Sequence, residues 1–71
     1  MKNVYITTEF IKLGQLLKLS DLASSGAEAK ILIEEGKVSL NGETCTERGK
    51  KVRPGDVVSL NGEKIKVCFE G

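Results

Sequence analysis

The sequence contains no histidine and no tryptophan, and it has one proline, one tyrosine and two phenylalanines. Without histidine, a mixed cysteine–histidine zinc site cannot form, and the two cysteines, Cys45 and Cys68, lack the CxxC spacing of metal and redox motifs. No serine or cysteine has a neighbouring residue that would act as an activating base. We therefore predict that the protein is not an enzyme, that it holds no metal or cofactor, and that its cysteines stay reduced.

Long apolar segments are also absent. The first ten residues, MKNVYITTEF, lack the apolar run of a signal peptide, and no segment approaches the length that spans a membrane. We expect a cytoplasmic protein that has no membrane partner. Because 71 residues allow only a modest hydrophobic core, we expect one domain, residues 1–71. We also expect a monomer.

The charged residues are unevenly distributed. The net charge is only +1, but RGKKVR at residues 48–53, here called the basic segment, places four cations within six positions. Such a stripe can contact phosphate groups even on a near-neutral domain. A second interpretation stays open, in which these side chains cover a loop and an edge strand and protect them from aggregation.

Residues 10–20 have the spacing of an amphipathic helix. Their apolar positions recur at intervals of three and four, which predicts a helix with Thr7 or Thr8 as its N-cap. Gly14 lies inside this helix and costs about 1 kcal/mol relative to alanine. Its presence predicts that another backbone or a ligand comes close at this position. Lys12 is mildly disfavoured by the helix dipole, which hints at a role other than helix stability.

A second helix is predicted over residues 26–35. Ser24 or Ser25 can accept a hydrogen bond from its first N–H groups, and Glu28 would complete a capping box with Ser25. Gly36 can adopt the left-handed conformation that ends a helix. The two helices should be adjacent, because only a short turn joins them.

Two further features bear on ligand contacts. The start of the second helix offers free N–H groups and a positive dipole, with Gly26 allowing close approach and Lys30 one turn along. Every helix has such an end, however, and serine is a common cap. The aromatic residues Tyr5, Phe10 and Phe69 sit at apolar-phase positions, so we predict them in the core and not in a base-stacking platform.

The remaining sequence alternates with the period of a β-strand. The hexapeptide VSLNGE occurs at residues 38–43 and 58–63, and its Asn-Gly pair favours a type I′ hairpin turn each time. RPGD at residues 53–56 predicts another turn. The sequences that flank the two copies differ. The hexapeptide therefore marks the same kind of strand end and turn at two places, and it does not indicate a repeat architecture. With a strand at residues 3–7, the predicted fold is α+β: two packed helices on a small, largely antiparallel sheet of hairpins.

In this order the elements resemble the RNA-binding domain first described in small-subunit ribosomal protein S-four, which also occurs in pseudouridine synthases and bacterial tyrosyl-tRNA synthetases. IKLGQLLKLSDLASSGAEAKILIEEGKVSLNG and VRPGDVV carry the resemblance, which spans about residues 10–60. With so little sequence outside this span, the chain is similar to the small stand-alone members of the family. The matching positions are Lys12-Leu13, Ser25, Ala29-Lys30, Gly36-Lys37-Val38, Asn41-Gly42 and Pro54-Gly55-Asp56.

The resemblance implies that the two helices and the loop before the first hairpin present a basic face to structured RNA, with ribosomal RNA or a ribosome-assembly particle as the natural target. Many members have an acidic residue at Gly14 and an arginine at Gly26. Gly26 removes that side-chain contact but leaves the backbone N–H groups, so binding should depend more on lysines and the basic segment. The predicted RNA contacts are Lys12, Ser25, Gly26, Lys30, Lys37, Arg48, Lys50, Lys51 and Arg53.

Three alternatives stay open. The protein could be an adaptor that binds another protein through the edge of its sheet. It could be a ubiquitin-like sulfur carrier, because the chain ends in Gly71, although such carriers need a Gly-Gly tail and this one ends CFEG. Phosphate contacts alone also do not separate RNA from DNA.

Overall fold

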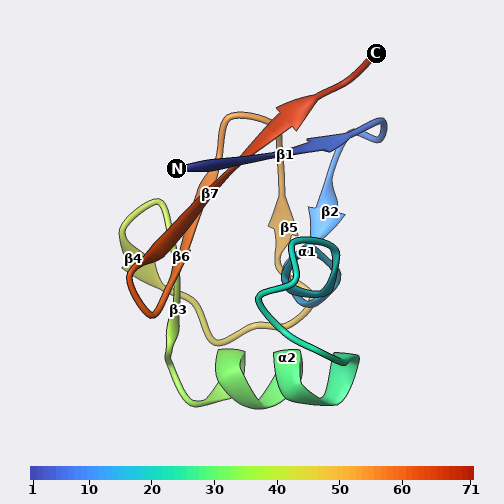
Figure 1. The fold of residues 1–71 in the computed structure, drawn as a ribbon. Coiled ribbons are helices and arrows are strands. Elements are labelled where there is room, and N and C mark those ends of the chain that lie inside the picture. Colours follow the sequence, from blue (N-terminus) through green and yellow to red (C-terminus); the bar gives the residue numbers. More distant parts are fainter.

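The computed structural model describes all 71 residues. Figure 1 shows two helices packed together on one side of a sheet, with the N-terminal and C-terminal strands crossing the top of the view. The elements in chain order are β1 (Lys2–Ile6), β2 (Ile11–Lys12), α1 (Leu13–Leu19), α2 (Gly26–Glu34), β3 (Val38–Leu40), β4 (Glu43–Thr44), β5 (Lys51–Val52), β6 (Val57–Leu60) and β7 (Glu63–Phe69).

The main sheet has five strands in the order β1-β7-β6-β3-β4. All its pairings are antiparallel except that of β1 with β7, which is parallel and brings the first and last strands together. The predicted α+β class, with two helices on a largely antiparallel sheet and an N-terminal strand, is confirmed. A second sheet, in which β2 pairs with β5, had no signal in the sequence.

One core of 14 buried apolar side chains joins the helices and both sheets. The alternation along β7 illustrates how the sheet covers it: Ile65 and Val67 are buried, whereas Lys64 and Lys66 are exposed. The main sheet therefore has one face on the core and one face toward solvent. Neither helix has the length and apolar character required to cross a membrane.

The predicted start of the first helix is wrong. Helix α1 begins at Leu13 and not at Phe10, because residues 11 and 12 extend to form β2. Neither predicted threonine caps the helix: the Thr8 hydroxyl donates to the carbonyl oxygen of Phe10 at 2.7 Å, and Lys12 occupies the N-cap position without a side-chain cap. Backbone carbonyl groups of the basic segment serve instead, as described below.

Helix α2 has the predicted caps. The Ser25 hydroxyl accepts the N–H of Glu28 at 3.1 Å, and the Glu28 carboxylate accepts the N–H and hydroxyl of Ser24 at 3.1 and 3.2 Å. The carboxylate thus reaches one residue further back than in the expected capping box. At the other end, Gly36 has a φ of 77° and its N–H donates to the carbonyl oxygen of Ile33 at 3.1 Å.

The prediction that the aromatic residues lie in the core is wrong for two of the three. Tyr5 and Phe69 are 56% and 57% exposed. Tyr5 lies between Val4 and Ile6, which both point into the core, so strand alternation turns it toward the solvent face. Phe69 is the last residue of β7, while Phe10 is half-buried beneath a lysine.

Candidate nucleic-acid interface

An open cleft of about 410 Å³ lies between α1, the start of α2 and the basic segment. It contains three cations and neither a hydrophobic nor an acidic side chain, so it is a surface that favours negative charge. We call it the basic cleft, and its lining residues are Lys12, Gly14, Gln15, Lys18, Gly26, Arg48 and Gly49.

Backbone hydrogen bonds attach the basic segment to α1. The N–H groups of Leu13 and Gly14 donate to the carbonyl oxygens of Lys50 at 2.9 Å and Arg48 at 3.1 Å. These bonds satisfy helix N–H groups that have no acceptor within the first turn. A Cβ atom on residue 14 would lie 2.9 Å from Cγ of Arg48, so a larger residue would displace this arginine. A close approach by another backbone or a ligand was predicted at Gly14. The backbone of Arg48 does come close, through its carbonyl oxygen, but the nearest group is the Arg48 side chain.

Two lysines face each other beside the cleft. Lys12 of β2 is directly opposite Lys51 of β5, and both are exposed. Like charges in opposite positions of a sheet are destabilising. Lys51 gains partial compensation because its Nζ lies 4.9 Å from the centroid of the Phe10 ring. No carboxylate forms an ion pair with either lysine, so an external anion would relieve their repulsion.

The N-terminus of α2 also reaches the basic cleft. No hydrogen bond within the protein uses the N–H groups of Gly26 and Ala27. A Cβ atom built on Gly26 would meet nothing within 4 Å, so a ligand can come close to this backbone. Lys30 lies one turn along the helix on the same side. Ser25, whose hydroxyl is occupied by Glu28, contributes by holding the helix end in place.

The other cations of the basic segment line a neighbouring hollow of about 590 Å³. Lys50, Lys51 and Arg53 lie there, and Gly49 is common to both hollows. Unlike the basic cleft, this hollow includes carboxylates, those of Glu43, Glu47 and Asp56. The basic segment is therefore divided: Arg48 faces a purely basic surface, and the other three cations face a mixed one.

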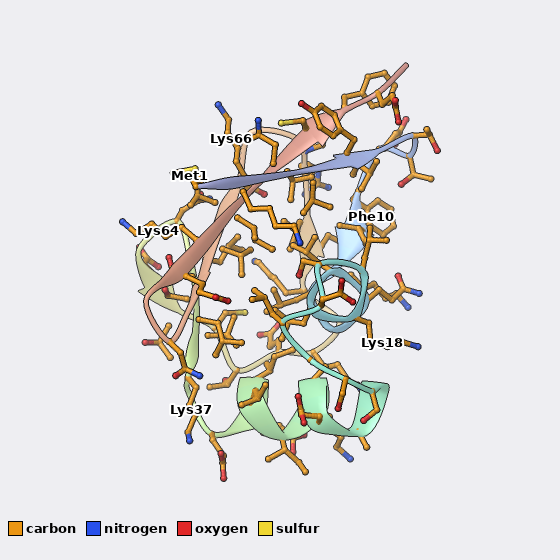
Figure 2. The ribbon with its side chains drawn as sticks, in the orientation of Figure 1. Met1, Phe10, Lys18, Lys37, Lys64 and Lys66 are labelled. Atoms are coloured by element: carbon orange, nitrogen blue, oxygen red, sulfur yellow. The ribbon has the colours of Figure 1, made fainter.

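The structure separates two lysines that the sequence does not distinguish. Lys37 follows the C-terminal end of α2, the end opposite Gly26, and its Nζ is 3.7 Å from the Glu35 carboxylate (Figure 2). It is not among the residues of the basic cleft, whereas Lys18, which we did not predict, lines it. The signal for Lys18 was its position four residues after Gly14, away from the buried leucines of α1.

Comparison with known proteins places the sequence in a family. Residues 4–68 match the S4 domain. The chain is 46% identical over 59 residues to a Bacillus subtilis protein named "Probable ribosome maturation protein RlbA", and the match covers 83% of each chain. It is also 44% identical over 43 residues to ribosomal large subunit pseudouridine synthase B of the same organism, but this match covers only 18% of the synthase.

Solved structures show the same fold. The solution structure of YbcJ from Escherichia coli superposes with a TM-score of 0.74 at 35% identity, covering 96% of this chain and 87% of YbcJ, and is described as containing an αL motif involved in RNA binding. The 30S ribosomal protein S4e of Thermoplasma acidophilum superposes with a TM-score of 0.62 at 29% identity, covering 82% of this chain and 31% of S4e. The chain belongs to the S4 domain family, the family that its motifs resemble.

Proposed function

We propose that this protein is a non-catalytic, cytoplasmic RNA-binding protein that recognises structured RNA, with ribosomal RNA or a ribosome-assembly particle as its target. The basic cleft is the observation that carries the proposal. Lys12, Lys18 and Arg48 reach it from β2, α1 and the basic segment, and no carboxylate of the protein neutralises them. Such a surface suits a polyanion as its partner.

The relatives support this function. RlbA is named for ribosome maturation and the YbcJ structure for an RNA-binding motif, and both proteins match most of this chain. The pseudouridine synthase lends no support to catalysis here, because the chain corresponds to less than a fifth of it. A sulfur carrier is not favoured, since neither the family nor the relatives are of that kind.

The chemistry of the cleft favours contacts to phosphate over contacts to base edges. The free N–H groups of Gly26 and Ala27 would donate to one phosphate, while Lys12, Lys18 and Arg48 surround it with positive charge. Contacts of this kind fix the position of a folded RNA and read its shape, and they carry little sequence information.

The other predicted contacts extend this surface. Lys30 lies beyond Gly26 on α2, and the hollow that contains Lys50, Lys51 and Arg53 would accept the adjoining phosphates. Lys37 would contribute only a peripheral contact, because it is distant from the cleft and already paired with a carboxylate.

Binding of a ribosomal RNA hairpin, measured over a range of salt concentrations, tests the proposal. The double variant Lys18→Gln, Arg48→Gln should reduce the slope of log affinity against log salt by roughly 1.5 and weaken binding by roughly tenfold or more. The matched variant Lys50→Gln, Lys51→Gln removes the same charge from the neighbouring hollow and should have a smaller effect. Equal losses would show that net charge and not the cleft governs binding.

Two further arms separate the alternatives. A DNA duplex of the same sequence should bind more weakly than the RNA hairpin, because its groove shape differs from that of A-form RNA. If no nucleic acid binds, and a protein partner instead binds with an affinity that salt hardly changes, the protein is an adaptor and the proposal is wrong.

A further inference from the structure

The solvent face of the main sheet, here called the outer sheet face, lies on the side away from both helices. Figure 2 shows Lys64 and Lys66 extending from β7 on the left, whereas Lys18 points from α1 toward the right. The strand register assigns Tyr5, Ser39, Ser59, Lys64, Lys66 and Cys68, among others, to this face, because their neighbours in sequence belong to the core.

Tyr5 offers an aromatic ring on this face. It is 56% exposed although Val4 and Ile6 on either side are 7% and 6% exposed, so the strand itself is firmly held. Its partner in the parallel register is the small side chain of Cys68, which leaves space around the ring. An exposed ring on a rigid strand can stack against a nucleobase of any kind.

Two lysines of the outer sheet face, Lys64 and Lys66, lie on β7, the strand next to that of Tyr5. Lys64, Lys66 and then Cys68, the partner of Tyr5, follow at intervals of two residues, roughly 7 Å each. Neither lysine forms an ion pair.

No carboxylate within the strands lies on this face. The two that occur in strands, those of Glu43 and Glu63, are in register with Leu40 and Leu60 of the opposite, core-facing set. Within its strands the face therefore combines one aromatic ring with two lysines. Glu70 continues the same alternation just beyond β7, where its N–H donates to the carbonyl oxygen of Ile6 at 2.8 Å.

We propose that the outer sheet face binds a single-stranded nucleic acid segment, with a base stacked on Tyr5 and the phosphates beside Lys64 and Lys66. A protein partner fits less well, because lysine is depleted in protein interfaces and the remaining side chains of this face are mostly small and polar. The inference rests on the proposed function and extends it: the target is a structured RNA with a single-stranded flank that passes around the domain.

Two RNAs test the inference: a blunt hairpin, and the same hairpin with a single-stranded tail of about ten nucleotides, which is within the usual site size of single-strand binders. We expect the tail to increase the affinity of the unaltered protein about tenfold. Because Tyr5 is the only tyrosine and tryptophan is absent, tyrosine fluorescence reports on this residue alone. The tailed RNA should quench it, and the blunt hairpin should not.

Variants then locate the contact. Tyr5→Thr, which keeps a strand-forming residue, should abolish the gain from the tail and leave blunt-hairpin binding unchanged. Tyr5→Phe keeps the ring and should retain most of the gain. Lys64→Gln with Lys66→Gln should reduce the salt slope for the tailed RNA only, by roughly 1.5.

The outcomes distinguish this inference from the proposed function. If the hairpin binds but the tail adds nothing, or if the gain persists in Tyr5→Thr, the inference is overturned while the basic cleft stands. If neither RNA binds, the proposed function fails as well.

Discussion

The two VSLNGE segments have the same backbone but different surroundings. The first turn has φ values of 52° at Asn41 and 87° at Gly42, and the second has 51° at Asn61 and 83° at Gly62. Identical residues therefore produce nearly identical turns, as expected when φ must be positive at both positions. The comparison shows which properties of a segment are local and which depend on its neighbours.

The two segments also pair with each other. Strands β3 and β6 are antiparallel, and each continues through its Asn-Gly turn into a further strand, β4 or β7. The centre of the main sheet is thus approximately symmetric about one residue pair. The register is Val38 opposite Leu60, Ser39 opposite Ser59 and Leu40 opposite Val58.

The side chains of the two asparagines break this symmetry. Asn41 donates from Nδ2 to the Asp56 carboxylate at 3.0 Å, and its Oδ1 accepts the N–H of Val57 at 2.9 Å. The other Asp56 oxygen accepts the N–H of Arg53 at 2.8 Å. Hydrogen bonds through Asp56 therefore connect the first turn to Arg53, at the end of the basic segment. The second turn has no such connection, because the Asn61 side chain makes no hydrogen bond.

Among the variants that test this asymmetry, replacement of Asp56 by alanine should cause the largest loss of stability. It removes the carboxylate that accepts from both Asn41 and Arg53, and we expect the free energy of unfolding to fall by about 2 kcal/mol. Urea denaturation measures this loss. Glu63→Ala, in the second hairpin, is the control and should change stability far less, because the Glu63 side chain makes no hydrogen bond.

Replacement of Gly42 or Gly62 by alanine tests the equivalence of the two backbones. Both positions have positive φ and open space around a new Cβ, so each variant should lose about 1 to 2 kcal/mol through backbone strain alone. The two losses should agree within about 0.5 kcal/mol. A large difference in the denaturation midpoints would mean that the turns are not equivalent.

Replacement of each asparagine by glycine separates the side chain from the backbone. Glycine keeps the positive φ, so Asn61→Gly should cost only a few tenths of a kcal/mol, whereas Asn41→Gly should cost about 1 kcal/mol more because its hydrogen bonds are lost. Thermal unfolding of the two variants side by side gives the difference. Equal losses would contradict a special role for Asn41.

Replacement of Ser39 or Ser59 by threonine should have the smallest effect. Both lie at the centre of the symmetric pair on the outer sheet face, where a β-branched residue fits well. Each change should stabilise the fold by a few tenths of a kcal/mol, and by the same amount. Denaturation of both single variants checks this, and opposite signs would show that the two environments differ.

Local patterns predicted much of the fold and part of the site. The cap at Ser25, the end of α2 at Gly36 and both Asn-Gly turns follow from short-range chemistry, and they were confirmed. Gly14 also signalled a close approach, because glycine inside a helix is costly. The start of α1 was missed, since it depends on residues distant in sequence. The exposure of Tyr5 and the position of Lys18 in the cleft were also missed, although strand alternation and the spacing from Gly14 carry a local signal for each.

The sequence by itself determined where this chain turns, which faces of its helices are apolar and which family it belongs to, because these properties reside in a few neighbouring residues. The tertiary structure decided the rest. Carbonyl groups of the basic segment, more than thirty residues away, fix the first turn of α1, and the pairing of β1 with β7 assigns Tyr5 to the solvent face. Such long-range contacts form only when the whole core is buried, so no local pattern records them.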